Sequence, residues 1–267
     1  MYELGVIGLG HIGVPIVNGA LSGKAVSPDQ VILYGHHPER LEPLLLAGAS
    51  AAKNEIEVAS SCHYLLLSVK PQSLSELLPK IKPFLRPDHV IISIAAGISA
   101  RYLKNALGED TKIVLAMPNT PLQLGFGTTA LSRIEPATQD EFAFAMRIFG
   151  VSGSAEEIPA ELMNEVIALN GSSPAFFYRI TQIFADRASQ YGFDHETAMR
   201  LICGSMIGAA HMMLSSGTSL DDLIQAVCSK GGTTIAGLTA MNDAHLDQAL
   251  IAGMEACTCL LYTSRCV

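Results

Sequence analysis

The sequence is poor in charged residues and lacks basic clusters. Only 16% of its 267 residues are Asp, Glu, Lys or Arg, and the formal net charge is −8. Nucleic acid binding needs a positively charged surface, so a nucleic acid partner is not expected. Because 49% of the residues are hydrophobic, the composition is that of a well-buried globular protein and excludes a disordered chain.

Three further absences narrow the class of protein. No apolar run approaches the length of a membrane span, and the chain opens on a strand pattern instead of a signal peptide. The six cysteines have no disulfide-framework spacing, which favours a reduced, cytoplasmic compartment. No His, Cys and carboxylate cluster suggests a metal site. We therefore expect no membrane partner and no metal.

The N-terminus carries the first functional motif. An apolar strand at 4–7 runs directly into Gly8-Leu9-Gly10-His11-Ile12-Gly13, and helical spacing of apolar residues follows at 14–21. This is the context of a dinucleotide fingerprint. Gly8 would make the tight turn, Gly10 would let a pyrophosphate lie against the backbone, and Gly13 would let helix and strand pack closely. The alternative is a glycine-rich turn without a ligand.

The tip of the second strand bears on the choice of cofactor. A strand at 31–34 is followed by Gly35-His36-His37-Pro38-Glu39-Arg40. A fold that binds NAD usually places a carboxylate at this tip, on the ribose hydroxyls. Here two histidines and Arg40 would suit a 2′-phosphate instead. We predict NADPH, with NADH as the alternative if Glu39 takes the acidic role.

The remaining patterns define an α/β fold. Strands at 64–69, 90–94 and 112–116 alternate with helical patterns at 39–46, 74–85 and 100–107, and a further strand at 128–131 and a helix at 139–149 follow. Such alternation predicts an N-terminal Rossmann-like, doubly wound sheet, which we place at 1–158. Ligands bind at the carboxyl ends of its strands.

From residue 159 onward only helical patterns occur, at 161–169, 174–191, 196–215 and 220–227. We predict an all-helical domain at 159–267. The segment 198–214 is apolar around much of its circumference and rich in small residues, so it needs burial on more than one side. We expect it to build a homodimer, alone or within a higher assembly of dimers.

A Gly-Gly turn separates two helical patterns near the C-terminus. It reads Lys230-Gly231-Gly232-Thr233-Thr234, and the second helix opens at the threonines. Glycines permit close approach of a ligand, and the free N–H groups of a helix N-terminus favour an anion. Taken alone, the turn is better explained as a helix–turn–helix corner with a threonine cap, and only the N-terminal motif favours a ligand.

Together these features resemble the pyrroline-5-carboxylate reductase family. The resemblance covers nearly the whole chain and rests on six stretches in the expected order: residues 8–13, Val69-Lys70-Pro71, Ser93-Ile94-Ala95-Ala96-Gly97, Ala116-Met117-Pro118-Asn119-Thr120-Pro121, Gly171-Ser172-Ser173-Pro174-Ala175 and Val227-Cys228-Ser229-Lys230-Gly231-Gly232-Thr233-Thr234.

The resemblance implies hydride transfer from NADPH to the cyclic imine of 1-pyrroline-5-carboxylate, giving L-proline. It implies a substrate-binding stretch from Lys230 to Thr234, in which the substrate carboxylate lies on backbone N–H groups of Gly232, Thr233 and Thr234. It also implies that Thr234 hydrogen-bonds the ring nitrogen. Residues 69–71 and 95–97 would border the nicotinamide, with Asn119 nearby, and Asn54 would lie near the adenosine ribose. Such a site needs little acid–base machinery, because a protonated imine is already electrophilic and orientation supplies most of the gain.

Four departures bear on the substrate and on the end of the chain. Lys230 stands where the family usually has proline, Phe176 where it commonly has tyrosine, and residues 242–245 replace a usual Gly-Phe. We hypothesise that Lys230 retunes substrate preference; unchanged KM values for cyclic imines in a Lys230→Pro variant would refute this. Residues 259–267 resemble a translated transposon end, and we expect a non-native tail there.

Two other functions remain open. The first is reduction of another small cyclic imine on the same fold. The second is a non-catalytic, nucleotide-binding dimer, and retention of Thr234 with both glycines argues against it. A reductase of hydroxy acids would carry a catalytic lysine in the helical domain, where Lys230 is the only lysine.

Overall fold

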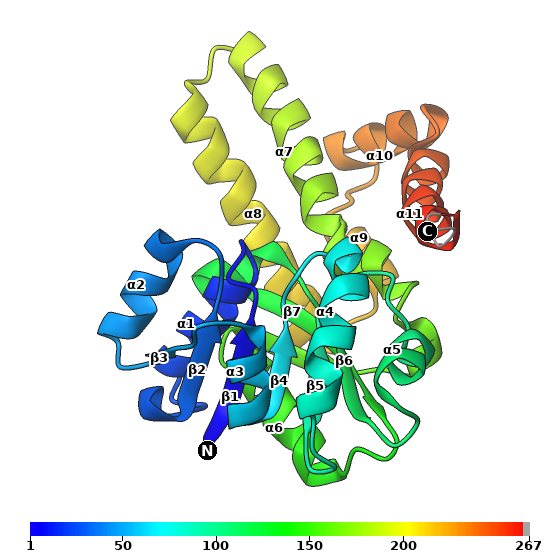
Figure 1. Ribbon diagram of the computed structural model, residues 1–267. Coiled ribbons are helices and arrows are strands. Elements are labelled where there is room, and N and C mark those ends of the chain that lie inside the picture. Colours follow the sequence, from blue (N-terminus) through cyan, green and yellow to red (C-terminus); the bar gives the residue numbers. More distant parts are fainter. Residues whose placement is uncertain (264–267) are drawn as a thin grey trace. The chain divides into compact units, whose positions relative to one another are not determined.

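The computed structural model describes residues 1–263, with side chains as far as 260 (Figure 1). Its internal contacts divide it into two compact units. The sheet unit comprises Met1–Pro174 together with the segment from Cys257, and the helical unit comprises Ala175–Ala256. The change of unit therefore falls between Pro174 and Ala175, later in the chain than the change of composition at 158.

The sheet unit is built on one eight-stranded sheet with the order β3-β2-β1-β4-β5-β6-β7-β8. Its neighbouring strands are parallel except for β6 and β7, which are antiparallel. The doubly wound fold is thus confirmed, although β3 and β8 were not predicted. The strands are β1 (Tyr2–Ile7), β2 (Val31–Tyr34), β3 (Ser50–Ala51), β4 (Cys62–Leu67), β5 (Val90–Ser93), β6 (Lys112–Pro118), β7 (Gly127–Ile134) and β8 (Gly153–Glu157).

Helices cover both faces of the sheet. One core lies under α1 (Gly13–Ser22), α2 (Pro38–Leu46) and α6 (Gln139–Gly150). The other lies under α3 (Glu55–Ser61), α4 (Leu74–Ile81) and α5 (Ala100–Leu107). Strand β4 ends in three consecutive leucines because Leu66 faces the first core while Leu65 and Leu67 face the second. Each such fully buried leucine contributes roughly 1.5–3 kcal/mol.

Short helical turns connect these elements. The 3₁₀ turns are η1 (Pro28–Gln30), η2 (Pro71–Ser73), η3 (Lys82–Phe84), η4 (Thr120–Leu124) and η5 (Ala160–Leu162), and η6 (Ile167–Gly171) is a π-helix. The continuous helix predicted at 161–169 is therefore wrong: the chain forms a 3₁₀ turn and a π turn there instead. Residue Asn170, in η6, is buried and bonded to the sheet.

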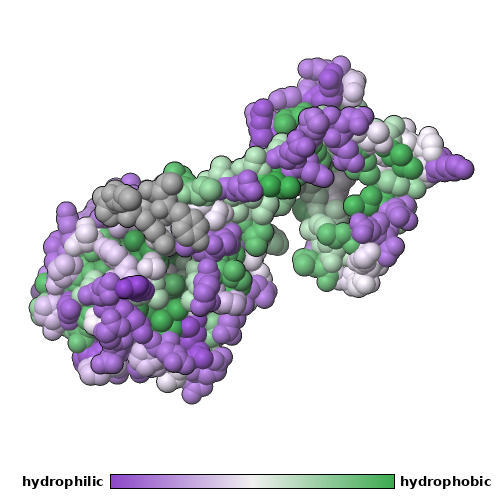
Figure 2. Space-filling view, turned by 90° about the vertical axis from the view of Figure 1, so that its right-hand side faces the viewer, coloured by the Kyte–Doolittle hydropathy of each residue, from purple (hydrophilic) through white to green (hydrophobic). Residues whose placement is uncertain are grey.

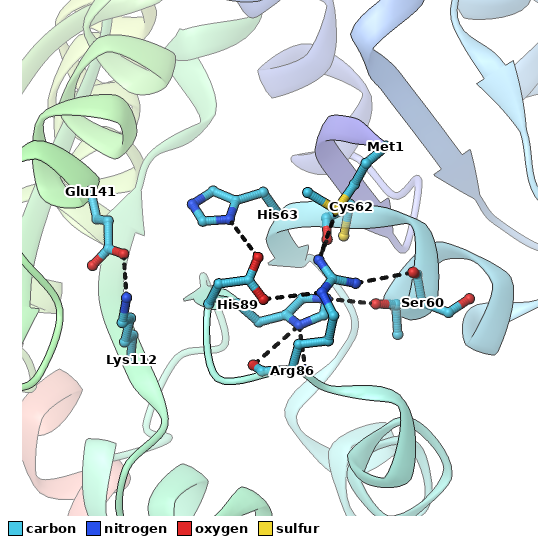
Figure 3. A network of polar contacts seen from close by, with 10 residues as sticks. Met1, Ser60, Cys62, His63, Arg86, His89, Lys112 and Glu141 are labelled. Atoms are coloured by element: carbon cyan, nitrogen blue, oxygen red, sulfur yellow. Dashed lines mark hydrogen bonds and ion pairs between the residues drawn. The ribbon is translucent and has the colours of Figure 1, made fainter.

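Arg86 fastens the amino ends of the central strands (Figure 3). Its guanidinium donates to the carbonyl oxygens of Ser60 (3.1 Å) and Cys62 (2.9 Å) and to Asp88 Oδ1 (3.0 Å). The buried ring of His89 contacts the carbonyl oxygen of Ala59 through Nε2 at 2.7 Å. Burial, assisted by the nearby Arg86 charge, lowers the pKa of His89, so its role here is that of a neutral structural group.

The helical unit contains α7 (Ser173–Gln190) from Ala175 onward, α8 (His195–Ser215), α9 (Leu220–Ala226), α10 (Thr233–Asp243) and α11 (Leu246–Thr263) as far as Ala256. Asp194 and Ser219 cap α8 and α9 by accepting from backbone N–H groups. His245 adopts φ 60° between α10 and α11, the left-handed conformation that a glycine would take most easily. Residues 264–267 of the predicted tail lie outside the described residues.

Large apolar side chains are exposed over this unit (Figure 2). In α8 only Ala198 is buried, and Met212 and Met213 are each about half-exposed. By length and composition alone, α8 is the one helix among residues 1–263 that could cross a membrane. That finding corrects the expectation that no apolar run approaches such a length. On α7, on α8 and in the turn between them, the exposed large apolar residues are Phe177, Tyr178, Ile183, Phe184, Tyr191, Phe193, Leu201, Ile207, Met212, Met213 and Leu214.

Glu141 provides a test of how α6 is fixed to the sheet. Its carboxylate accepts from Lys112 Nζ (2.6 Å) and from the backbone N–H of Thr138 (2.8 Å), which closes a capping box. Burial of the carboxyl acts to raise its pKa, but the hydrogen bonds from Lys112 and Thr138 outweigh burial, so the pKa is lowered from 4.5.

We predict that Glu141→Gln lowers the free energy of unfolding by about 1 kcal/mol at neutral pH. A lowered folded-state pKa gives stability that is fully present above about pH 4.5 and is lost as the pH falls through the folded-state pKa. The difference from wild type should therefore shrink in acid, as measured by urea unfolding across pH. Glu135→Gln, at an exposed position, is the control; an equal deficit at all pH values would contradict this account.

Candidate functional site

The turn between β1 and α1 is held by two glycines that leave no room for side chains. Gly8 has φ 100°, and a Cβ there would collide with the carbonyl group of Ser68. A Cβ on Gly13 would collide with the carbonyl oxygen of Gly8 and the hydroxyl of Ser68. Gly10 is different, because no atom lies within 4 Å of its Cβ position. The turn is therefore packed tightly against β4 on one side and open at Gly10 on the other.

The open side of this turn suits an anion. Ile12 occupies the N-cap position of α1, no side chain caps the helix, and its first turn holds no acidic residue. The N–H of Val14 donates to the carbonyl oxygen of Gly10 (3.2 Å) and Pro15 has no N–H, so the N–H of Gly13 is left for an anion, and the helix dipole favours negative charge beside it. The sequence prediction that Gly8, Gly10 and Gly13 differ in purpose agrees with this geometry.

A pocket of about 850 Å³ opens at the carboxyl edge of the sheet, beside the glycine turn. Thirteen of the predicted cofactor-binding residues line it: Gly8, Leu9, Gly10, His11, Ile12, His36, His37, Arg40, Val69, Lys70, Pro71, Ala95 and Ala96. The pocket also has lining residues that sequence reasoning missed, among them Tyr34, Glu55, Ser68, Ser73, Glu76 and Lys80. Glu76 and Lys80 come from α4, and only the three-dimensional fold brings them to this edge.

The tip of β2 presents basic groups to the pocket. Arg40 Nη1 lies 3.4 Å from the carbonyl oxygen of Leu9, which holds the guanidinium beside the glycine turn. The ring of His36 packs edge-on against Tyr34, with centroids 5.4 Å apart. Glu39 pairs instead with His37 at 3.1 Å and does not line the pocket. This arrangement suits the 2′-phosphate of NADPH better than the free ribose hydroxyls of NADH.

Four predicted cofactor residues do not line the pocket. Gly13 packs against Gly8 and Ser68, and Gly97 has φ 74° in the turn after β5. The Asn54 side chain caps α3 by accepting from the N–H of Glu57 at 2.9 Å, while its neighbour Glu55 lines the pocket. Asn119 is buried and bonded within the sheet unit. Direct contacts between these four residues and a cofactor stay predictions.

The Gly-Gly turn lies in the helical unit. Gly231 has φ 72°, and a Cβ on Gly232 would collide with the hydroxyl of Ser229, so both positions favour glycine. Gly232 is the N-cap of α10, which therefore starts at Thr233 without a side-chain cap and without an acidic residue in its first turn. The alternative explanation, a threonine cap, is therefore not supported, and the uncapped helix start favours the anion-binding interpretation. Lys230 is exposed in the turn.

These features define a dinucleotide-dependent oxidoreductase. Comparisons with known proteins agree: residues 3–97 match the family model described as NADP oxidoreductase, coenzyme F420-dependent, and residues 160–260 match the model for pyrroline-5-carboxylate reductase dimerisation. No group of three or more His, Cys, Asp or Glu side chains that could hold a metal occurs within the described residues.

Proteins that are similar over nearly the whole chain show which family of oxidoreductases it belongs to. A pyrroline-5-carboxylate reductase of Escherichia coli strain K12 is 32% identical over 96% of this chain and 95% of its own length. One from Methanosarcina acetivorans is 30% identical over 93% of each chain. The solved structure of a pyrroline-5-carboxylate reductase from Coxiella burnetii has a TM-score of 0.90 at 26% identity, with 98% of each chain covered. The chain belongs to the pyrroline-5-carboxylate reductase family.

The contrast between two glycines of the turn generates a prediction. Gly10→Ala should fold with near wild-type stability, because its Cβ meets no atom, yet it should weaken NADPH binding at least tenfold by obstructing the phosphates. Gly13→Ala should instead lower the unfolding midpoint, since its Cβ meets backbone. Thermal unfolding and NADPH titration of both variants separate the two effects. Equal destabilisation of both would refute the distinction.

Proposed function

We propose that this chain reduces 1-pyrroline-5-carboxylate to L-proline at the expense of NADPH. The single structural observation that carries the proposal is the open phosphate-binding turn beside a basic β2 tip, in a pocket that reaches Ala95 and Ala96. Membership of the family supports the imine as substrate. NADPH, when bound, supplies the hydride, and the protein has to bind and orient the two reactants.

Orientation of the cofactor falls to the carboxyl edge of the sheet. Residues 8–13 would hold the pyrophosphate, while His36, His37 and Arg40 would hold the 2′-phosphate. Lys70-Pro71 and Ala95-Ala96 follow β4 and β5 and would border the nicotinamide. These residues line one continuous pocket, so a single extended dinucleotide can touch all of them. Asn119 would act indirectly, because both polar groups of its side chain already have partners.

Substrate binding is assigned to the Gly-Gly turn. The uncapped N-terminus of α10 offers the backbone N–H groups of Thr233 and Thr234 to a carboxylate. The N–H of Gly232, which the resemblance also assigns to the carboxylate, donates to the carbonyl oxygen of Ser229 at 2.8 Å in this structure. The Thr234 hydroxyl would hydrogen-bond the ring nitrogen and fix the imine carbon relative to the hydride donor. Lys230 would add positive charge beside the carboxylate, and Gly231 would allow the turn to approach it.

Oligomerisation follows from the exposed apolar residues of the helical unit. An apolar α8 with one buried residue is unstable in water unless another surface covers it, and the match to a dimerisation model indicates a second copy. We propose a homodimer, alone or within a higher assembly, and a domain boundary for this function at 158/159.

Burial of α8 between subunits would also account for its apolar length, so no membrane partner is proposed. A cytoplasmic location and the absence of a nucleic acid partner complete the proposal, the latter because the net charge is −8.

The direct test is NADPH consumption by the purified protein with the five-membered imino acid, its six-membered homologue and no imine in parallel. We expect fast turnover of the five-membered ring. Turnover confined to the six-membered ring would favour a different cyclic imine. NADPH binding without turnover of either would favour the non-catalytic dimer.

Arg40 should set the preference between cofactors. We predict that Arg40→Gln raises the KM for NADPH about tenfold and leaves the KM for NADH nearly unchanged, because only NADPH carries the 2′-phosphate. Arg101→Gln, at an exposed position of α5 outside the pocket, should alter neither value. Equal losses with both cofactors would mean that Arg40 acts only by holding the Leu9 carbonyl.

Thr234 should act on the substrate and not on the cofactor. Replacing it by valine keeps the shape and removes one hydroxyl, so kcat/KM for the imine should fall about tenfold to a hundredfold while the Kd for NADPH stays constant. Thr233→Val is the matched control, since Thr233 is assigned only a backbone contact. A similar loss in both variants would contradict the role given to the Thr234 hydroxyl.

A further inference from the structure

One wall of the cofactor pocket is still without an assigned contact. It is formed by helices α3 and α4, which pack against each other on the same face of the sheet (Figure 1). The residues of these helices that line the pocket are Glu55 from α3 and Glu76, Leu77 and Lys80 from α4. We call these four residues the α3/α4 wall.

The α3/α4 wall brings two carboxylates into a pocket that the proposed function gives to an anionic ligand. NADPH carries a pyrophosphate and a 2′-phosphate, and a carboxylate beside either group would repel it. The proposed function places these phosphates at residues 8–13 and beside Arg40, on other parts of the pocket lining. Glu55 and Glu76 therefore suit a part of the cofactor that carries no negative charge.

The adenine base is the uncharged part of the cofactor that remains. The nicotinamide belongs at the ends of β4 and β5, where Lys70 and Ala95 line the pocket. Adenine is bonded to the ribose that carries the 2′-phosphate, so it belongs near Arg40 at the β2 tip. The chain leading into α3 lies at this tip, because the N–H of Ala52 donates to the carbonyl oxygen of Leu33 at 2.9 Å. The α3/α4 wall thus begins where the base has to be held.

Helix α4 presents an acceptor and a donor toward the same pocket. Glu76 and Lys80 are four residues apart, so they occupy neighbouring positions on the helix surface. Such a pair can form an ion pair, yet the ion pairs recorded between described residues include neither side chain. Leu77 beside them is buried, at 5% exposure, and offers apolar contact to a flat ring. Adenine presents its 6-amino donor next to a ring-nitrogen acceptor, which complements this arrangement.

We propose that the α3/α4 wall binds the adenine base of the cofactor and that the Glu76 carboxylate accepts a hydrogen bond from its 6-amino group. This inference rests on the proposed use of NADPH. Glu76 would determine specificity for the base, because hypoxanthine has a carbonyl oxygen at this position and would set one acceptor against another. Glu55 is not given this contact, since it is the first residue of α3, where the helix N-terminus already stabilises its charge.

The test compares two reduced cofactors in direct binding measurements. One is NADPH and the other is its hypoxanthine analogue, in which a carbonyl group replaces the 6-amino group and nothing else is altered on the base or the nicotinamide. The chain has no tryptophan, so the fluorescence of the bound reduced cofactor is free of tryptophan emission. Wild type, Glu76→Gln and Glu55→Gln are titrated with each cofactor.

Glu55→Gln is the matched control, because it removes the same charge from the other helix of the same wall. The ratio of the two Kd values is the readout, since loss of a negative charge changes the affinity for both anionic cofactors alike. Glu76 is exposed on α4, so its variant should fold, and thermal unfolding of all three proteins checks this.

Wild type should bind NADPH about tenfold more tightly than the analogue, the value of one hydrogen bond to a charged group. Glu76→Gln should reduce that preference to about twofold or less, because an amide can donate to the hypoxanthine carbonyl as well as accept from the amine. Glu55→Gln should keep the preference. An unchanged preference in Glu76→Gln, or its loss in Glu55→Gln, would overturn the assignment of Glu76. Equal affinities of wild type for the two cofactors would exclude the hydrogen bond without reference to any variant.

Failure of the proposed reaction gives a different result. A chain that binds NADPH with the base preference but turns over no imine would keep the assignment of Glu76 and lose the reductase activity. A chain that binds neither dinucleotide would overturn both. A rise in the imine KM of Glu76→Gln, with the base preference unchanged, would place Glu76 beside the substrate and so overturn the proposal.

Discussion

The close packing of Gly8 and Gly13 against Ser68 is the constraint on which the cofactor pocket depends. Without side chains at these positions, β1, α1 and β4 meet in one turn, and the start of α1 faces the carboxyl edge of the sheet. The cofactor residues are arranged around that turn. The carbonyl oxygen of Leu9 accepts a hydrogen bond from Arg40, and Lys70 and Ala95 line the same pocket at the carboxyl edge of the sheet. A larger residue at either glycine would separate the strand from the helix.

The helical unit depends on a different balance. Helices α8 and α9 begin at side-chain caps, yet the large apolar residues of the unit are mostly exposed within one chain. Hydrophobic burial is the main stabilising term in folding, and this unit obtains little of it alone. Association through such a surface would make the stability of the unit depend on protein concentration. The match of residues 160–260 to a model named for dimerisation agrees with this balance.

Much of the sheet unit could be predicted because its signals are local. The apolar run of β4 and the glycine hexapeptide specify a buried strand and a phosphate turn without reference to distant residues. The short edge strand β3 was missed because its two residues have no alternation to detect. The helix expected at 161–169 failed because Asn170 bonds to Met117 and Thr128, contacts that lie far away in sequence.

The residues of the candidate site also differ in whether local sequence signals could predict them. Thirteen cofactor residues lie together because strand ends in a parallel sheet share one edge, a rule that sequence reasoning can apply. Glu76 and Lys80 line the pocket because α4 packs beside it, and no local sequence pattern predicts that packing.

The central claim is that hydride passes directly from NADPH to a cyclic imine held by this chain. The most direct measurement uses NADPH with deuterium at both hydrogen positions of nicotinamide C4 and unlabelled 1-pyrroline-5-carboxylate, followed by mass spectrometry of the product. The account predicts L-proline with a single deuterium on the ring carbon that was the imine carbon. Unlabelled proline, or no proline while NADPH remains bound, would contradict it.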